Sequence, residues 1–93
     1  MSINVRIPTI LRTYTDGASE VTLDDAGTTL ASALESLETA APGITARILD
    51  DSGELRRFVN IYVNDEDVRF AGGLRTPLAE SAAIAVIPAV AGG

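Results

Sequence analysis

The residues best suited to a chemical role lie at the carboxyl end of the chain. Pro88 is followed by five residues with small or medium side chains: Ala89, Val90, Ala91, Gly92 and Gly93. Pro88 and the β-branched Val90 favour an extended backbone, and the two glycines carry no side chain. Fully extended, the segment reaches about 15–18 Å at roughly 3.3–3.6 Å per residue. We expect it to thread into a narrow slot of a partner and to present the α-carboxylate of Gly93 there.

An α-carboxylate is ionised at neutral pH and is a poor acyl donor, so it must first be activated, most simply as an acyl-adenylate. The chain contains no Cys, no His and no Lys, and all seven basic residues are Arg. It therefore lacks the side chains that most often act as activated nucleophile or general base. The residues predict a substrate acted on by another enzyme, with no catalytic residue of its own. A two-glycine end without a function is the alternative.

Two acidic clusters are the other places where chemistry could sit: Asp24-Asp25 and Asp65-Glu66-Asp67. Both fall in expected turns, where carboxylates are normally solvated. The second cluster lacks the twelve-residue calcium-loop pattern with its closing Glu. We therefore expect neither catalysis nor a metal site at either cluster.

Composition narrows the kinds of partner. Of the 93 residues, 46% are hydrophobic and 22% are charged, which suits one globular domain. Thirteen acidic residues against seven Arg leave a net charge of −6, which argues against nucleic acid and favours partners with basic docking surfaces. The longest apolar stretch, 82–91, is too short to span a bilayer. We expect a cytoplasmic chain that binds no membrane and is monomeric when free.

A hairpin of two strands is predicted at the amino end. Apolar residues occupy every second position in two short segments, at Ile3, Val5 and Ile7 and at Val21 and Leu23. Asp16-Gly17 is a strong reversal signal between them. The segment 9–12 is expected to continue the first strand as an irregular edge.

One long helix is predicted next. Four residues spaced four, three and four apart share one helical stripe: Leu30, Leu34, Leu37 and Ala41. Thr28 or Thr29 can cap its amino end, and Pro42-Gly43 ends it. The segment 44–49 is ambiguous, with a single helical turn as one option.

Further strands are expected in the second half. They are 55–63, a short returning strand at 68–70 and, after an irregular crossover, 83–87. A hairpin, one helix and returning strands indicate an α+β fold in which a mixed sheet covers one main helix. We expect one domain, 1–88, and a flexible tail, 89–93. The predicted core comprises Ile3, Val5, Ile7, Val21, Leu23, Leu30, Leu34, Leu37, Val59, Ile61, Val63, Leu78, Ile84 and Val86.

The segment 87–93 resembles the tail of the ubiquitin-like sulfur-carrier proteins of the ThiS and MoaD type. Two internal segments, 7–12 and 57–70, look most like the CysO type of actinobacterial cysteine biosynthesis. The resemblance implies the β-grasp fold, a mixed sheet of four or five strands gripping one helix, over essentially the whole chain. This chain departs from the family pattern at Ser81-Ala82, where these carriers usually have Gly-Asp in the turn before the last strand.

The resemblance implies a mechanism carried out by partner enzymes. An E1-like activating enzyme uses ATP and magnesium to adenylate Gly93, and sulfur then displaces AMP to leave a thiocarboxylate. In the CysO-type pathway this group attacks an aminoacrylate on a pyridoxal-phosphate cysteine synthase, and a metallopeptidase later releases cysteine. No cofactor is expected on this chain. Docking in the family uses apolar surface beside the tail root, where Ile87 and Phe70 are the candidates; a core position for Phe70 is equally open.

Other functions stay open. The chain could be the small subunit of a molybdopterin synthase, which has the same terminal chemistry. It could be a ubiquitin-like modifier joined through Gly93 to lysines of target proteins, or an acidic binding module whose tail has no role. The final sulfur acceptor is also open, between cysteine and another metabolite such as a thiosugar.

Overall fold

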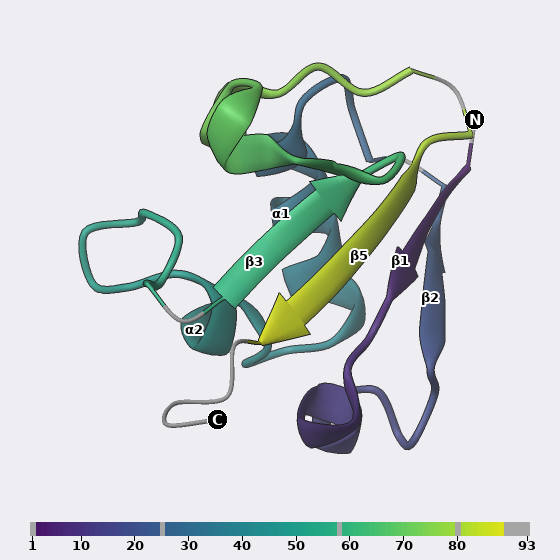
Figure 1. Ribbon diagram of the computed structural model, residues 1–93. Helices are drawn as coiled ribbons and strands as arrows, with labels where there is room; N and C mark the ends of the chain where they lie inside the picture. The colour runs from purple at the N-terminus through teal and green to yellow at the C-terminus, as the bar shows by residue number, and fades with distance from the viewer. Residues whose placement is uncertain (1, 25, 58, 80, 89–93) are drawn as a thin grey trace.

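In the computed structural model the chain forms a five-stranded mixed sheet with α1 and α2 packed on one face (Figure 1). The structure describes residues 2–24, 26–57, 59–79 and 81–88. Its strands and helices, including the 3-10 helices labelled η, are β1 (Ile3–Arg6), η1 (Thr9–Tyr14), β2 (Glu20–Leu23), α1 (Leu30–Ala40), α2 (Thr45–Ile48), β3 (Val59–Val63), β4 (Glu66–Asp67), η2 (Val68–Phe70), η3 (Gly73–Arg75) and β5 (Ala83–Pro88).

β5 occupies the centre of the sheet, whose strand order is β2-β1-β5-β3-β4. It runs parallel to β1 and antiparallel to β3, as Figure 1 shows. Ile84 lies opposite Val5 on one side and opposite Val63 on the other. At the end of β5, Pro88 pairs with Val59, the first residue of β3. The chain therefore leaves the sheet from a strand that is hydrogen-bonded to two neighbours.

The amino-terminal hairpin is confirmed, with one difference after its first strand. β1 and β2 are antiparallel, and the turn between them contains Asp16 and Gly17 at φ of 57° and 86°. The segment 9–12, expected as an irregular edge, instead lies in the 3-10 helix η1. The carbonyl of Pro8 accepts the N–H of Leu11 at 2.9 Å, and the Leu11 side chain is buried. Burial of this leucine favours the helical turn over a continued strand.

The long helix is confirmed as α1, and Thr29 is its N-cap. Thr29 Oγ1 accepts the backbone N–H of Ser32 at 3.3 Å, while Ser32 Oγ accepts that of Thr29 at 3.1 Å. This reciprocal pair satisfies two amides that the helix itself leaves unbonded. Gly27, at φ 78°, lies against the Ser32 hydroxyl, so a Cβ there would overlap the cap.

Two strand predictions were wrong in their extent. The strand expected over 55–63 begins only at Val59, because Leu55 forms an isolated bridge with Leu49 and the N–H of Arg56 donates to the carbonyl of Ile48 at 2.9 Å. The segment 68–70 is the 3-10 helix η2 and not a strand, because Asp67 Oδ1 accepts the N–H of Arg69 at 2.9 Å. The returning strand is β4, two residues long, inside the segment expected as an acidic turn.

The turn before β5 closes without glycine. Ser81 adopts φ 61°, a left-handed conformation that L-residues rarely occupy. The N–H of Ala82 still reaches the carbonyl of Ala79 at 3.2 Å. The departure from the family's Gly-Asp is therefore accommodated by backbone strain at Ser81.

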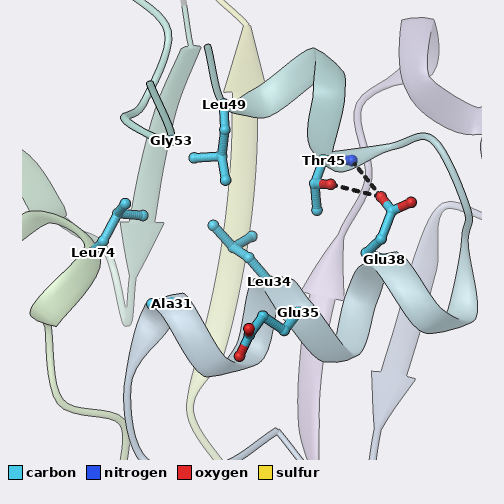
Figure 2. A pocket seen from close by; sticks show the side chains of 8 residues that line it. All are labelled: Ala31, Leu34, Glu35, Glu38, Thr45, Leu49, Gly53 and Leu74. Carbon is cyan, nitrogen blue, oxygen red and sulfur yellow. Dashed lines mark hydrogen bonds between the residues drawn. The ribbon is translucent and has the colours of Figure 1, made fainter. Parts of the chain in front are cut away.

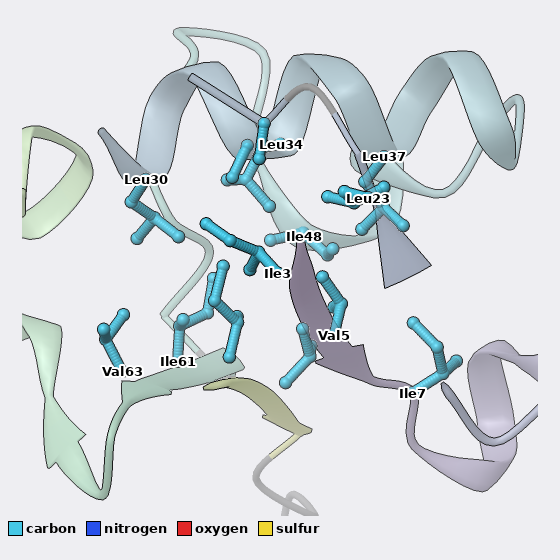
Figure 3. Packing of buried hydrophobic residues seen from close by; sticks show 14 of the residues in the cluster. Ile3, Val5, Ile7, Leu23, Leu30, Leu34, Leu37, Ile48, Ile61 and Val63 are labelled. Carbon is cyan, nitrogen blue, oxygen red and sulfur yellow. The ribbon is translucent and has the colours of Figure 1, made fainter. Parts of the chain in front are cut away.

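The core lies between the sheet and α1, with α2 closing one end (Figure 3). All predicted core residues are buried except Val21, which is half-buried and packs against the cluster. The prediction omitted Ala33 of α1 and the following buried residues of short elements and turns: Leu11, Ala26, Ala41, Ile44, Ile48, Val68 and Ala82. Each fully buried Val, Leu or Ile contributes about 1.5–3 kcal/mol of transfer free energy. No helix among the described residues is long and apolar enough to cross a membrane.

Candidate functional site

The structure describes the chain as far as Pro88, the root of the predicted tail. The tail residues themselves, Ala89, Val90, Ala91, Gly92 and Gly93, lie outside the described residues. The last described residue, Pro88, pairs with Val59, so the root of the tail is set by the β3–β5 ladder. The predicted threading segment thus begins directly at a defined strand end.

Ile87 lies on the face of the sheet opposite to the helices. Its neighbour Val86 is 2% exposed and faces the core, whereas Ile87 is 46% exposed. Across the ladder, Ile87 is paired with Asn60 of β3. The outer face is also hollowed over two small residues of β5, Ala83 and Ala85, in a depression of about 330 Å³. The outer face thus presents the exposed Ile87 beside the tail root and a depression farther back along β5, toward the start of that strand.

Arg69 extends the row formed by Ile87 and Asn60. Its Nη1 donates to Asn60 Oδ1, and its Nη2 donates to the carbonyl of Arg56 at 2.8 Å. Both acceptors are neutral, so these bonds orient the guanidinium without cancelling its charge. The exposed Arg69 side chain thereby links η2 to the beginning of β3, next to the strand that carries the tail.

Two other large apolar side chains are exposed. Phe70 follows Arg69 in η2 and is 88% exposed, so the core alternative for Phe70 was wrong. Ile10 in η1 is 68% exposed and was not predicted as a site residue. Because β1 runs parallel to β5, with Arg6 opposite Ala85, η1 follows β1 at the same end of the sheet as Ile87. The end of the alternating pattern at Pro8 was the one sequence feature that indicated a different environment for Ile10.

A groove of about 390 Å³ lies on the helical layer, away from the tail root (Figure 2). Leu34, Leu49 and Leu74 surround it, and Glu38 stands at its rim. The Glu38 carboxylate is already engaged: Oε1 accepts from Thr45 Oγ1 at 2.6 Å and from its N–H at 3.1 Å, and Oε2 accepts from the N–H of Gly43 at 2.8 Å. These bonds, that of the Thr45 hydroxyl first, lower the pKa of the Glu38 carboxyl. The Glu38 carboxylate therefore ties the start of α2 to α1, and Glu35 also lines the groove.

The acidic clusters hold no site in the described part of the chain. Asp65 is exposed in the β3–β4 turn, Glu66 is exposed in β4, and Asp67 caps η2 through its bond to Arg69 N. Asp24 is exposed, and Asp25 lies outside the described residues. No group of three or more His, Cys, Asp or Glu that could hold a metal occurs among the described residues.

The chain is similar to known proteins over its full length. The profile of the ThiS family matches residues 5–93. Sulfur carrier protein CysO of Mycobacterium tuberculosis is 50% identical over 95 residues, which span 100% of each chain. A chain of the crystal structure of the Amycolatopsis orientalis BexX/CysO complex has a TM-score of 0.89 and 44% identity, covering 98% of this chain and 99% of that one.

A more distant relative carries a different description. Small archaeal modifier protein 3 of Haloferax volcanii is 39% identical over 70 residues, 75% of this chain and 73% of the relative. The sheet order, the single main helix and the solved neighbours confirm the expected β-grasp fold. The profile match and the full-length identity together show that the chain belongs to the ThiS family.

Proposed function

We propose that this chain is a sulfur carrier, a protein substrate whose Gly93 carboxylate is converted to a thiocarboxylate that donates sulfur in biosynthesis. The observation that carries the proposal is the full-length 50% identity with a CysO sulfur carrier, in a chain that keeps a Gly92-Gly93 end. The absence of Cys, His and Lys supports a substrate in place of an enzyme.

The proposed chemistry has two steps, both in a partner's active site. An E1-like activating enzyme, which uses ATP in the presence of magnesium, joins a Gly93 carboxylate oxygen to the α-phosphorus of ATP, and pyrophosphate leaves. A sulfur nucleophile then attacks the carbonyl carbon, and AMP leaves with that oxygen. Such activation is needed because a free carboxylate is a poor acyl donor. Since it consumes ATP, we expect the chain to act in the cytoplasm.

This chain's own contribution is to deliver one carboxylate on a narrow backbone. β5 fixes where the tail starts, and the five residues from Ala89 to Gly93 supply reach with little side-chain width. A partner can offset the cost of ordering them, about 1–2 kcal/mol per residue, by binding the backbone as an added strand. Ile87 and Phe70, both exposed, are proposed to dock the partner beside the root.

The proposed acceptor is a pyridoxal-phosphate cysteine synthase, with a metallopeptidase that releases the cysteine. Support comes from the CysO descriptions of the relatives and from the Amycolatopsis orientalis relative, whose structure is a complex with BexX. Another acceptor, such as an enzyme that makes a thiosugar, would use the same docking surface and tail. The cofactors belong to these partners.

The decisive experiment is intact-mass spectrometry after incubation with ATP, magnesium, a sulfide source and the host's activating enzyme. We expect a gain that matches one oxygen replaced by sulfur, mapped to Gly93 by fragmentation. The control is the same chain without Gly93, which must fold normally and gain no sulfur. An unchanged mass of the full chain, with an enzyme proven active on another carrier, would contradict the proposal.

A modifier role is the second candidate, because one relative is described as a small archaeal modifier protein. In that role the activated Gly93 carbonyl forms an amide bond with a lysine amine of a target protein. Ladders of conjugates in cell extract that disappear on deletion of Gly93 would favour it. The sulfur-carrier proposal predicts sulfur on Gly93 without such ladders.

A further inference from the structure

We propose that Arg69 makes the docking surface cationic as well as apolar, and that the activating enzyme meets it with a carboxylate beside an apolar pocket. This inference rests on the proposed function, because it concerns the partner that adenylates Gly93. It gives a role to Arg69, which takes no part in the proposed adenylation and sulfur transfer at Gly93.

The first argument is position. Ile87, Asn60 and Arg69 form one continuous row on the outer face, since Ile87 pairs with Asn60 and Arg69 donates to Asn60 Oδ1. The row runs from the strand that carries the tail to η2, where Phe70 is exposed. A partner that seats Ile87 therefore also meets the Arg69 guanidinium.

The second argument is preorganisation. Nη2 of Arg69 donates to the carbonyl of Arg56, and the backbone N–H of Arg69 donates to Asp67 Oδ1 at 2.9 Å. A guanidinium fixed in this way has lost part of its rotamer freedom before binding, so less entropy is lost when a carboxylate pairs with it. Its side-chain acceptors are neutral, so the positive charge is available to the partner.

The third argument is contrast of charge. The chain carries −6 overall, which attracts a basic partner surface in any orientation. Arg69 adds a fixed positive charge beside exposed Ile87, so a carboxylate on the partner can pair here at one defined place. Charges of this kind contribute orientation and association rate more than total affinity. The Arg69 contact would thus align the tail with the slot.

The test compares charge-matched variants in pyrophosphate exchange into ATP, catalysed by the activating enzyme. Arg69→Glu should raise the KM for the carrier about tenfold or more, with kcat little changed, and the loss should shrink as salt is added. The control is Arg75→Glu, the same charge change on exposed Arg75 of η3, which packs on α1 and not on the outer face. Its KM should stay within about twofold of the unmodified chain.

Asn60→Asp separates a docking charge from a structural brace. The new carboxylate keeps the hydrogen bond with Arg69 but neutralises the charge of its guanidinium. If Arg69 acts by its charge, binding of the activating enzyme weakens, whereas a purely structural role of the hydrogen bond is preserved. We expect a raised KM with an unchanged melting temperature. Equal KM values for the Arg69 and Arg75 variants, or an unaltered KM for Asn60→Asp, would overturn the inference while leaving the carrier role intact. Absence of exchange with the unmodified chain would overturn both.

Discussion

The core beneath the sheet and the end of the sheet at the tail root share strand β5 but make opposite use of it. Ile84 and Val86 are each 2% exposed and pack under α1, whereas Ile87 is 46% exposed on the other face. The alternation of a strand places these residues on opposite sides. Their difference teaches that one strand can secure the fold with one set of side chains and leave the other set free for a partner.

A substitution in the tail is expected to give the largest difference between the effect on adenylation and the effect on stability. Gly92→Phe should abolish adenylation, because the bulky ring cannot pass a slot that admits only a backbone. The free energy of unfolding should not change, since Val86 is the last buried residue in the part of the chain that the structure describes. Pyrophosphate exchange and urea denaturation measure the two effects. Normal exchange with this variant would show that the slot is wide.

A substitution in the core should have the reverse effect, lowering stability and leaving adenylation unchanged. Ile61 is 0% exposed at the centre of β3, so Ile61→Ala should reduce the free energy of unfolding by about 2–5 kcal/mol. Adenylation of the fraction that remains folded should be normal. Chemical denaturation followed by circular dichroism gives the stability. A loss below about 1 kcal/mol would mean that the core can collapse around the cavity.

The same substitution on the other face sharpens the comparison. Ile87→Ala should change the free energy of unfolding by less than about 1 kcal/mol, because much of this side chain is exposed. It should nevertheless raise the KM for the carrier in pyrophosphate exchange. Titration calorimetry with the activating enzyme provides an independent measure. If Ile87→Ala and Ile61→Ala proved equally destabilising, the division between the two faces would be wrong.

A smaller loss of stability is expected from a substitution at the N-cap of α1, which stabilises the helix but is not part of the buried core. Thr29→Ala should cost about 1 kcal/mol, because the cap to Ser32 N is lost. Thr28→Ala is the matched control, since its exposed side chain is adjacent and does not cap α1. Urea midpoints of the two variants measure the difference. Equal midpoints would place the cap elsewhere.

The smallest effect concerns pH. Hydrogen bonds from Thr45 and Gly43 lower the pKa of Glu38 below its ordinary value of 4.5. The resulting stabilisation is therefore complete above about pH 4.5 and is lost as pH falls through the lower pKa of the folded state. Glu38→Gln should be less stable than the unmodified chain at neutral pH, with the difference vanishing in acid. Glu35→Gln, on the same helix, is the control, and a parallel pH profile for both would contradict this account.

The sequence predicted the elements that carry a repeated hydrophobic pattern or a local turn motif. The hairpin, α1 and β5 follow from alternation, a helical stripe and the Asp16-Gly17 turn, and all are confirmed. The 3-10 segments escaped prediction because each depends on one contact, a tertiary one in η1 and a local one in η2. Leu11 is buried by η1, and Asp67 caps η2, and neither contact has a periodic signature.

The candidate site was predicted unevenly for a similar reason. The tail was predicted from its run of small residues after Pro88, and Ile87 and Phe70 were predicted as docking residues from the family resemblance. Ile10 and Arg69 were not predicted, because their places beside the root depend on pairing between distant segments. The parallel register of β1 with β5 brings η1 to that end of the sheet, and the Arg69–Asn60 bond joins residues nine positions apart.

The central position of β5 also has a mechanical consequence. A pull on the tail is transmitted to rows of hydrogen bonds on both sides of β5, with β1 and with β3. Because both ladders lie along the strand, the load is shared as shear by many bonds and is not concentrated on one. An edge strand such as β2 would instead peel away from its single neighbour. If the tail acts as proposed, an enzyme can draw on it, hold it and release it repeatedly while the domain stays folded.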